Sequence, residues 1–321
     1  MKRTTIKDVA QRAGVSISAV SYILNESDKK KYAPETVERV REAARVLGYV
    51  PSSIARSMRA RQANTLGVVT LWSMGERVFV KLLEGIVSRA ARENYAVLLC
   101  PYDAYLEYFR NGRMDGVIFV APPSGNRLCE EEADVRRMRE AGLPSVIIHG
   151  QSRLPEVSYL YFDFCDAIEQ LTEYLISQGH REITYVTPSQ GDGPEVTERL
   201  RGYLGTMQRH GLVPDVCPDD QIAGRMSAFR AVVANKSETA RKVLHHALAG
   251  GYRIPEDFPV VAGNTEDYSQ YLYPPLTTTQ FPFEAVGERA VEVLLDQIRA
   301  PEPQPPVVEY ARSSILRRQS G

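Results

Sequence analysis

Residues 5–25 read TIKDVAQRAGVSISAVSYILN and predict two short helices joined by a tight turn. Thr5 is placed to cap the first helix, with Asp8 three residues on in the position of a capping box. Gly14 supplies the turn, and Ser16 is placed to cap the second helix. Apolar residues at helical spacing give the two helices a shared buried side, namely Val9, Ala10, Ala13, Ala19, Val20, Ile23 and Leu24. The pattern is typical of a helix-turn-helix, whose second helix enters the DNA major groove N-terminus first.

The exposed positions expected on the second helix are Ile17, Ser18, Ser21 and Tyr22. The alternative is a helical hairpin in an ordinary core. The charge distribution favours DNA, because residues 1–61 hold 13 Lys and Arg against 6 Asp and Glu, whereas the other residues hold 26 against 34. A basic head on an acidic body fits a DNA-binding module joined to a body that does not bind phosphate backbones. Chance clustering of surface charge is the alternative to that interpretation.

From Leu66 onward the pattern changes to short apolar runs of strand length, with amphipathic helical stretches such as residues 78–93 and 166–178 between them. The runs are LGVVTL, AVLLC, GVIFV, SVII, EITYVT, AVVA and FPVVA. Alternating strands and helices predict parallel sheets with helices on both faces, and there are enough units for two lobes. Two units look short, with only a brief helix around residues 105–110 and almost none between 212 and 230. A final helix is expected over residues 284–298.

The remaining composition argues against other classes of protein. The cysteines Cys100, Cys129, Cys165 and Cys217 are widely spaced and predict neither a disulfide framework nor a metal site. No apolar signal region or membrane-spanning run is present, so a cytoplasmic protein is expected. No glycine-rich phosphate loop, nucleophile elbow or metal-ligand spacing points to an enzyme, and no cofactor is predicted.

Several stretches resemble the LacI/GalR (lactose and galactose repressor) family. Residues 10–25, AQRAGVSISAVSYILN, are similar to its usual A-x-x-A-G-V-S-x-x-T-V-S-R-V-L-N. Residues 49–69 resemble its hinge and first core strand, and YRIPEDFPVVAG and PPLTTTQFPFEAVGERAVEVLL match near the C-terminus. The resemblance implies a helix-turn-helix DNA-binding head over residues 1–50 and a hinge helix with linker over 51–64. Residues 65–321 would form an α/β core of two doubly wound parallel-sheet lobes, similar to periplasmic binding proteins, for effector binding and dimerisation.

The resemblance also assigns roles in the head. Ile17, Ser18, Ser21 and Tyr22 would face the bases, while Thr5, Ser16 and Asn25 would contact phosphates. Tyr22 stands where the family usually has arginine, and tyrosine cannot form the bidentate hydrogen bonds that arginine makes with guanine. Met58 takes the place of the usual leucine that wedges into the minor groove. The operator sequence therefore cannot be transferred from relatives.

An effector site between the lobes is implied at positions that match the family's motifs. Ligands of open α/β sheets bind beyond the carboxyl ends of strands. The matching residues are Trp72, Phe79, His149, Asp163, Arg199 and Lys236. Core packing is an equal alternative for Trp72. His149 and Lys236 stand where the family has aspartates, which favours an anionic effector such as a phosphorylated sugar or a carboxylate, held by an arginine fork. The rival interpretation is that ligand control has decayed and Lys236 points into solvent.

These observations leave two hypotheses. The first is a dimeric repressor that reads a pseudo-palindromic DNA operator and is modulated by a small molecule in the cleft. The second is a DNA-binding regulator whose core only dimerises and binds no effector. Sequence alone does not separate them.

Overall fold

The structure, a computed structural model, describes residues 4–25, 32–49, 62–70, 77–121, 128–150, 154–190, 193–264 and 266–321. The chain forms two compact units, one of Met1–Thr65 with Glu107–Asp115 and one of Leu66–Leu106 with Gly116–Gly321. Of the predicted site residues, Met58 and Trp72 lie outside the described residues, and for Asn25 only the backbone is described.

The first unit contains the three helices of the head, α1 (Ile6–Ala13), α2 (Ile17–Asn25) and α3 (Pro34–Val46). The Thr5 amide donates a 2.8 Å hydrogen bond to the Asp8 carboxylate, and Gly14 turns the chain with a φ of 64°. Ser16 accepts a hydrogen bond from the Ala19 amide at 3.1 Å and so caps α2. The apolar faces meet in a small core of Val9, Ala10, Ala13, Val20, Ile23, Val40, Ala43 and Ala44. The predicted helix-turn-helix is therefore present.

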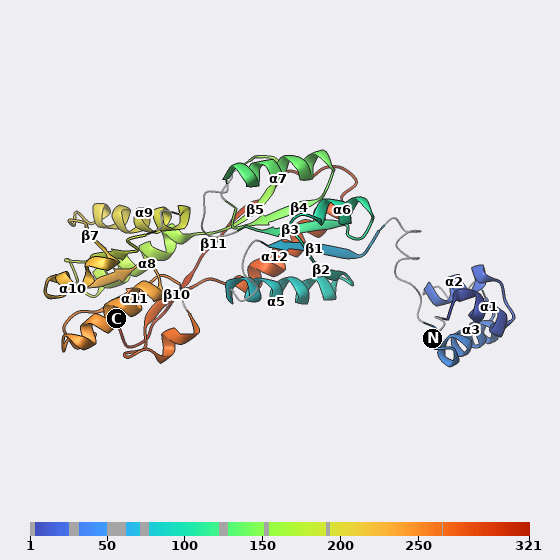
Figure 1. Cartoon of the computed structure of the whole chain (residues 1–321), viewed down its shortest axis with the longest axis horizontal. Coiled ribbons are helices and arrows are strands. Elements are labelled where there is room, and N and C mark those ends of the chain that lie inside the picture. The colour runs from blue at the N-terminus through green and yellow to red at the C-terminus, as the bar shows by residue number, and fades with distance from the viewer. Residues whose placement is uncertain are drawn as a thin grey trace. The chain divides into compact units, whose positions relative to one another are not determined.

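The second unit contains the two α/β lobes expected from the alternation of strands and helices (Figure 1). The sheet of the first lobe has the strand order β11-β5-β4-β3-β1-β2, and the pairs from β11 through to β1 are parallel. The bounds are β1 Thr65–Thr70, β2 Ala96–Cys100, β3 Gly116–Val120, β4 Ser145–Ile148, β5 Ser158–Phe162 and β11 Val308–Ala311. Helices α5 (Arg77–Arg92) and α12 (Phe283–Arg299) lie against one face and α7 (Leu128–Glu140) against the other (Figure 1).

The sheet of the second lobe has the order β12-β10-β9-β8-β6-β7, with only β12 antiparallel to its neighbour. The bounds are β6 Thr184–Thr187, β7 Asp215–Pro218, β8 Val232–Ala234, β9 Val260–Ala262, β10 Thr277–Gln280 and β12 Ser314–Leu316. Helices α8 (Phe164–Ser177) and α9 (Pro194–Arg209) cover one face, and α11 (Ser237–Ala249) covers the other. Successive β8 residues alternate between these faces, as the pleat requires, with Val232 and Ala234 on one and Val233 on the other.

Both shortened units are present. In the first lobe the helix α6 spans only Tyr105–Arg110, and tyrosines fill the space instead. Tyr102 and Tyr105 pack edge-on against Phe119 of β3 and both donate hydrogen bonds to buried Asp134. In the second lobe three short turns follow β7, namely η2 (Asp219–Gln221), α10 (Ile222–Arg225) and η3 (Met226–Ala228). The core of this lobe includes Ile222 and Met226 from these turns and Phe229, which directly follows them. The shorter segment therefore still covers the sheet.

The helix pair α5 and α12 packs at close range. A β-carbon on Gly85 would lie 1.9 Å from the Glu284 carbonyl oxygen, and one on Gly287 would lie 2.2 Å from that of Leu82. Neither distance is possible for a real side chain, so these two glycines set the spacing of the helices. Because α12 follows β10 in sequence but packs in the first lobe, this contact joins the C-terminal part of the chain to the first lobe.

Candidate functional site

The N-terminal end of α2 carries the candidate DNA-contacting surface. Ile17 is 41% exposed, and Ser16 and Ser18 are also exposed. Tyr22 is half-buried, because its ring packs edge-on against Tyr32 at 5.5 Å. The expectation that Ser21 is exposed is wrong, since it is 7% exposed on the inner side of the helix. Ile17 and Ser18 therefore form the open part of the surface, with Tyr22 at its edge.

The second candidate site lies beyond the carboxyl ends of the strands, where four residues form a closed ring of contacts. The guanidinium carbon of Arg199 lies 4.2 Å from the centre of the Phe164 ring. Phe164 meets the His149 ring edge-on at 5.2 Å. His149 Nε2 lies 3.6 Å from Glu195 Oε2, and Glu195 is one helical turn before Arg199 on α9. Two residues of this ring, His149 and Arg199, were predicted from the sequence.

Helix α9 positions Arg199 in this ring. The helix begins at Pro194, a favourable first-turn residue, and Gly193 is its N-cap. Its buried side contains Arg199, Gly202 and Tyr203. A β-carbon on Gly202 would lie 2.3 Å from the Cys165 carbonyl oxygen, so α9 packs tightly on α8. This packing brings Arg199 over Phe164, the first residue of α8.

Burial makes the charge of Arg199 costly. The residue is 3% exposed, and desolvation lowers the pKa of its guanidinium despite the nearby Glu195. In the described part of the chain no side chain or carbonyl accepts a hydrogen bond from the guanidinium, which lies over the Phe164 ring. A buried guanidinium without an acceptor is suited to a ligand that brings one.

Two further buried oxygens at this end of the sheets receive no hydrogen bond from any residue that the structure describes. They are Glu195 Oε2 and Asn235 Oδ1, and Asn235 directly follows β8. The Asn235 amide group donates to Tyr185 at 2.7 Å, and burial raises the pKa of Tyr185 to about 12. His149 adopts a φ of 62°, in the left-handed region where non-glycine residues are uncommon and often functional.

The other predicted effector residues have different surroundings. Asp163 caps α8 and accepts a hydrogen bond from the Asp166 amide at 2.9 Å. Phe79 is 1% exposed and packs in the core of the first lobe, so its ring is not an open surface. Lys236 directly follows Asn235, and its ammonium lies 3.7 Å from the Glu238 carboxylate. Each of the basic residues at positions 149 and 236 thus has a carboxylate neighbour.

Sequence reasoning missed Glu195, Tyr185 and the ring of Phe164 as parts of this site. The four-residue spacing of Glu195 and Arg199 on one helix could have identified Glu195. Asn235 directly precedes the predicted Lys236 in the sequence, but its contact with Tyr185 depends on the adjacent positions of β6 and β8. Among the described residues, no group of three or more His, Cys, Asp or Glu is arranged to hold a metal ion.

Comparison with known proteins finds a matching family description for the head and for the C-terminal part of the core. Residues 5–52 match the description "Bacterial regulatory proteins, lacI family", and residues 172–320 match "Periplasmic binding protein-like domain". The chain is 29% identical over 318 residues to the HTH-type transcriptional repressor PurR of Vibrio atlanticus (strain LGP32), covering 92% of each chain. It is 27% identical to that of Vibrio campbellii (strain ATCC BAA-1116), covering 98% of this chain and 97% of the relative.

Solved structures of the same architecture cover nearly the whole chain. A transcriptional regulator CelR–cellobiose complex is 25% identical with a TM-score of 0.66, covering 99% of this chain and 100% of the other. The Lac repressor dimer bound to operator and the anti-inducer ONPF is 21% identical with a TM-score of 0.79, covering 99% of each, and this likeness concerns the fold. No helix in the described part of the chain combines the length and apolar character that a membrane crossing requires.

Proposed function

We infer that this chain is a member of the lacI family of bacterial regulatory proteins and a sequence-specific DNA-binding transcriptional repressor. We propose that residues 1–50 bind DNA, that residues 51–64 form the hinge, and that residues 65–321 bind an effector and dimerise. The observation that carries the proposal is the capped helix-turn-helix with Ile17 and Ser18 open at the start of α2.

In this proposal α2 enters the major groove with its N-terminal end. Ile17 and Ser18 are the base readers, and Tyr22 adds one contact from the edge, since a phenol can donate a single hydrogen bond or pack on a thymine methyl. Thr5, Ser16 and Asn25 contact phosphates, and Met58 wedges into the minor groove. The burial of Ser21 leaves it a packing role, so we remove it from the base readers.

The head is tested by selecting bound sequences from random duplex DNA at two salt concentrations. Ile17→Ala is expected to change the selected sequence, and Val46→Ala, an apolar and similarly exposed residue at the end of α3, serves as its control. Affinity for the selected site should fall as salt rises, because phosphate contacts release counterions. Binding without sequence preference, or the same selected sequence for Ile17→Ala and wild type, would contradict the assignment.

We propose that the effector binds beside Arg199. The ligand supplies the acceptor that this buried guanidinium lacks, and it also contacts His149, which follows β4 of the first lobe, and Lys236, which comes two residues after β8 of the second. Effector binding would change whether the hinge is ordered and so change the affinity for DNA. A typical coupling free energy between an effector site and a second binding site is about 1–3 kcal/mol. An anionic effector, such as a sugar phosphate or a carboxylate, remains the first class to test.

A thermal-shift screen against neutral sugars, sugar phosphates and small carboxylates tests the cleft. Glu195→Gln removes the negative charge beside Arg199 and His149, so it should tighten binding of an anion and leave a neutral sugar nearly unaffected. Lys236→Asp should weaken only an anion. If neutral sugars raise the melting temperature equally in wild type and in both variants, the effector is not an anion, but the proposed binding site beside Arg199 stands.

A homodimer matches the two half-sites of a pseudo-palindromic operator. We propose that the exposed apolar residues Val80 and Val87, seven apart on α5, form part of the dimer surface with Leu99 of β2. In sedimentation, Val87→Glu should produce monomers, whereas Leu248→Glu, at an exposed apolar residue of α11, should not. If Val87→Glu still forms dimers, the dimer surface does not include this part of α5.

The alternative is a regulator whose core dimerises without binding an effector. A broad panel that gives no thermal shift, together with unchanged operator affinity in Arg199→Gln, would favour this alternative. In either case we propose a cytoplasmic protein without catalytic activity, since its target is chromosomal DNA and its relatives are transcriptional repressors.

A further inference from the structure

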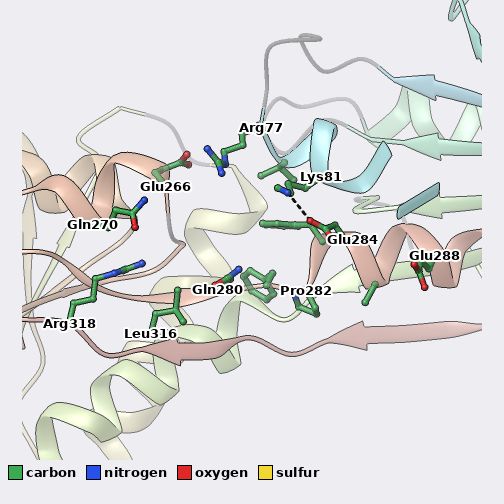
Figure 2. Close-up of a pocket in the computed structure, with 14 residues that line it drawn as sticks. Arg77, Lys81, Glu266, Gln270, Gln280, Pro282, Glu284, Glu288, Leu316 and Arg318 are labelled. Atoms are coloured by element: carbon green, nitrogen blue, oxygen red, sulfur yellow. Dashed lines mark hydrogen bonds and ion pairs between the residues drawn. The ribbon is translucent and has the colours of Figure 1, made fainter. Parts of the chain in front are cut away.

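The second unit contains a cavity of about 640 Å³ that none of the predicted effector residues lines. Its walls come from the start of α5, the start of α12, the segment after β9, and the ends of β10 and β12 (Figure 2). The volume falls in the range of pockets that hold small molecules. It is therefore a candidate for a second ligand site.

A layer of phenylalanines lies between this cavity and the Arg199 site. Phe281 lines the cavity, and its ring also meets that of Phe164 edge-on at 5.3 Å. Phe283 lines it as well and meets Phe162 at 5.1 Å. Since Phe164 contacts both Arg199 and His149, the two sites share a wall but not their polar groups.

The carboxylates of the cavity already have partners. Glu284 accepts from Lys81 at 2.7 Å, as the dashed line in Figure 2 shows, and Glu288 pairs with Arg92. Glu266 takes part in a capping box at the start of η4 (Asp267–Tyr271). These carboxylates leave little unmatched negative charge to attract a cationic ligand.

Arg318 is different, because no carboxylate in the described part of the chain pairs with it. One nitrogen, Nη1, donates to the Leu276 carbonyl at 2.6 Å and to Thr278 at 3.1 Å. Partial burial alone lowers the pKa of its guanidinium. Figure 2 shows the side chain extending toward the space that Gln270 and Gln280 also border. The Nε and Nη2 donors are thus available to an anion.

Apart from Arg77 at the start of α5, the rest of the lining is apolar, with Val78, Phe281, Pro282, Phe283, Ala285 and Leu316. We propose that this cavity binds a small organic acid, with its carboxylate on Arg318 and its apolar body against Phe281 and Leu316. A guanidinium can hold a carboxylate with two donors, and the two glutamine amides can take its remaining lone pairs. The proposal does not depend on the DNA-binding role or on the Arg199 ligand.

The test is calorimetric titration of the full chain with phenylacetate, using the neutral phenylacetamide as its matched probe. Saturable binding of phenylacetate with at least about tenfold weaker binding of the amide is expected, since a charge-assisted pair is lost. Arg318→Gln should weaken phenylacetate about tenfold, whereas Arg317→Gln, next to it and stacked on Tyr174 instead, should not.

A second variant guards against a folding defect in Arg318→Gln. Ala285→Trp fills the cavity from an exposed position of α12 and removes no hydrogen bond, so it should abolish binding in a folded protein. Equal binding of both probes, or binding retained in Ala285→Trp, would overturn the proposal. Binding lost in Arg199→Gln would place the acid in the first site instead and leave the proposed effector cleft standing.

Discussion

Arg199 lies with its guanidinium carbon 4.2 Å from the centre of the Phe164 ring, and both residues are almost fully buried. The pair comes from two helices that pack together at Gly202. A desolvated cation over an aromatic ring gains about 2 kcal/mol, which is less than the cost of burying a charge. The protein therefore holds this cation at an energetic cost, as expected where an anion or hydroxyl acceptor is to be bound.

Replacing Arg199 by Met should keep or raise the stability of the ligand-free protein, by about 1 kcal/mol, because a buried charge without a paired acceptor is removed. The same variant should show no thermal shift with any ligand that stabilises wild type. Urea unfolding measures the first effect, and Arg201→Met, an exposed position on the same helix, is the control. A large loss of stability in Arg199→Met alone would show a structural role.

Adding a methyl group between α5 and α12 should be severely destabilising. Gly287→Ala would put a β-carbon 2.2 Å from the Leu82 carbonyl, which forces the helices apart and should cost at least about 2 kcal/mol. Gly205→Ala in α9 meets nothing closer than Arg209 at 3.7 Å and should gain about 0.5–1 kcal/mol from helix propensity. Both are measured by urea unfolding, and similar effects of the two would reject the close contact.

The pair of Glu309 and Arg289 should contribute stability that depends on pH. The hydrogen bonds from Arg289, at 2.8–3.2 Å, lower the pKa of the Glu309 carboxyl in the folded state. Its contribution is present above the unfolded value of about 4.3 and is lost as pH falls through the lower folded pKa. Both side chains are about 40% exposed, so the contribution should stay below about 1 kcal/mol at pH 7.

Comparing Glu309→Gln with wild type in urea at pH 7 and pH 3 measures this effect. The difference should shrink at pH 3, because the ionic contribution of Glu309 is lost as pH falls through its folded pKa. Glu302→Gln, an exposed residue in the preceding segment, should show no such change. A difference that is equal at both pH values would exclude an ionic contribution.

Two variants of Tyr22 should distinguish its role in packing from its role in contacting DNA bases. Its ring contacts Tyr32 at 5.5 Å, so Tyr22→Phe keeps that contact and removes only the hydroxyl, whereas Tyr22→Ala removes both. We expect Tyr22→Phe to melt like wild type and to change the preferred base at one operator position. Selected sequences and melting curves measure the two effects. An unchanged preference in Tyr22→Phe would limit the residue to packing.

Local chemistry was enough to predict the head and most of the core elements. Caps at Thr5 and Ser16, the glycine turn and the helical spacing of apolar residues act within a few residues, and the structure shows each of them. The short α6 was also predicted with its bounds, Tyr105–Arg110. The strands β5, β7, β10 and β12 were not predicted, because polar residues, prolines and tyrosines interrupt the apolar pattern that marks a buried strand.

Contacts between distant segments were decided only by the tertiary structure. The ring of Arg199, Phe164, His149 and Glu195 needs β4, α8 and α9 to meet, and the cavity at Arg318 needs β12 beside β10. The burial of Ser21 and Phe79 likewise depends on which neighbours cover them. Sequence by itself predicted the helix-turn-helix, the alternation of strands and helices, and the resemblance to the LacI/GalR family, since these patterns depend on residues close along the chain. The polar partners of each charge were decided by the packing of the sheets and helices, since that packing sets which side chains come within hydrogen-bonding distance.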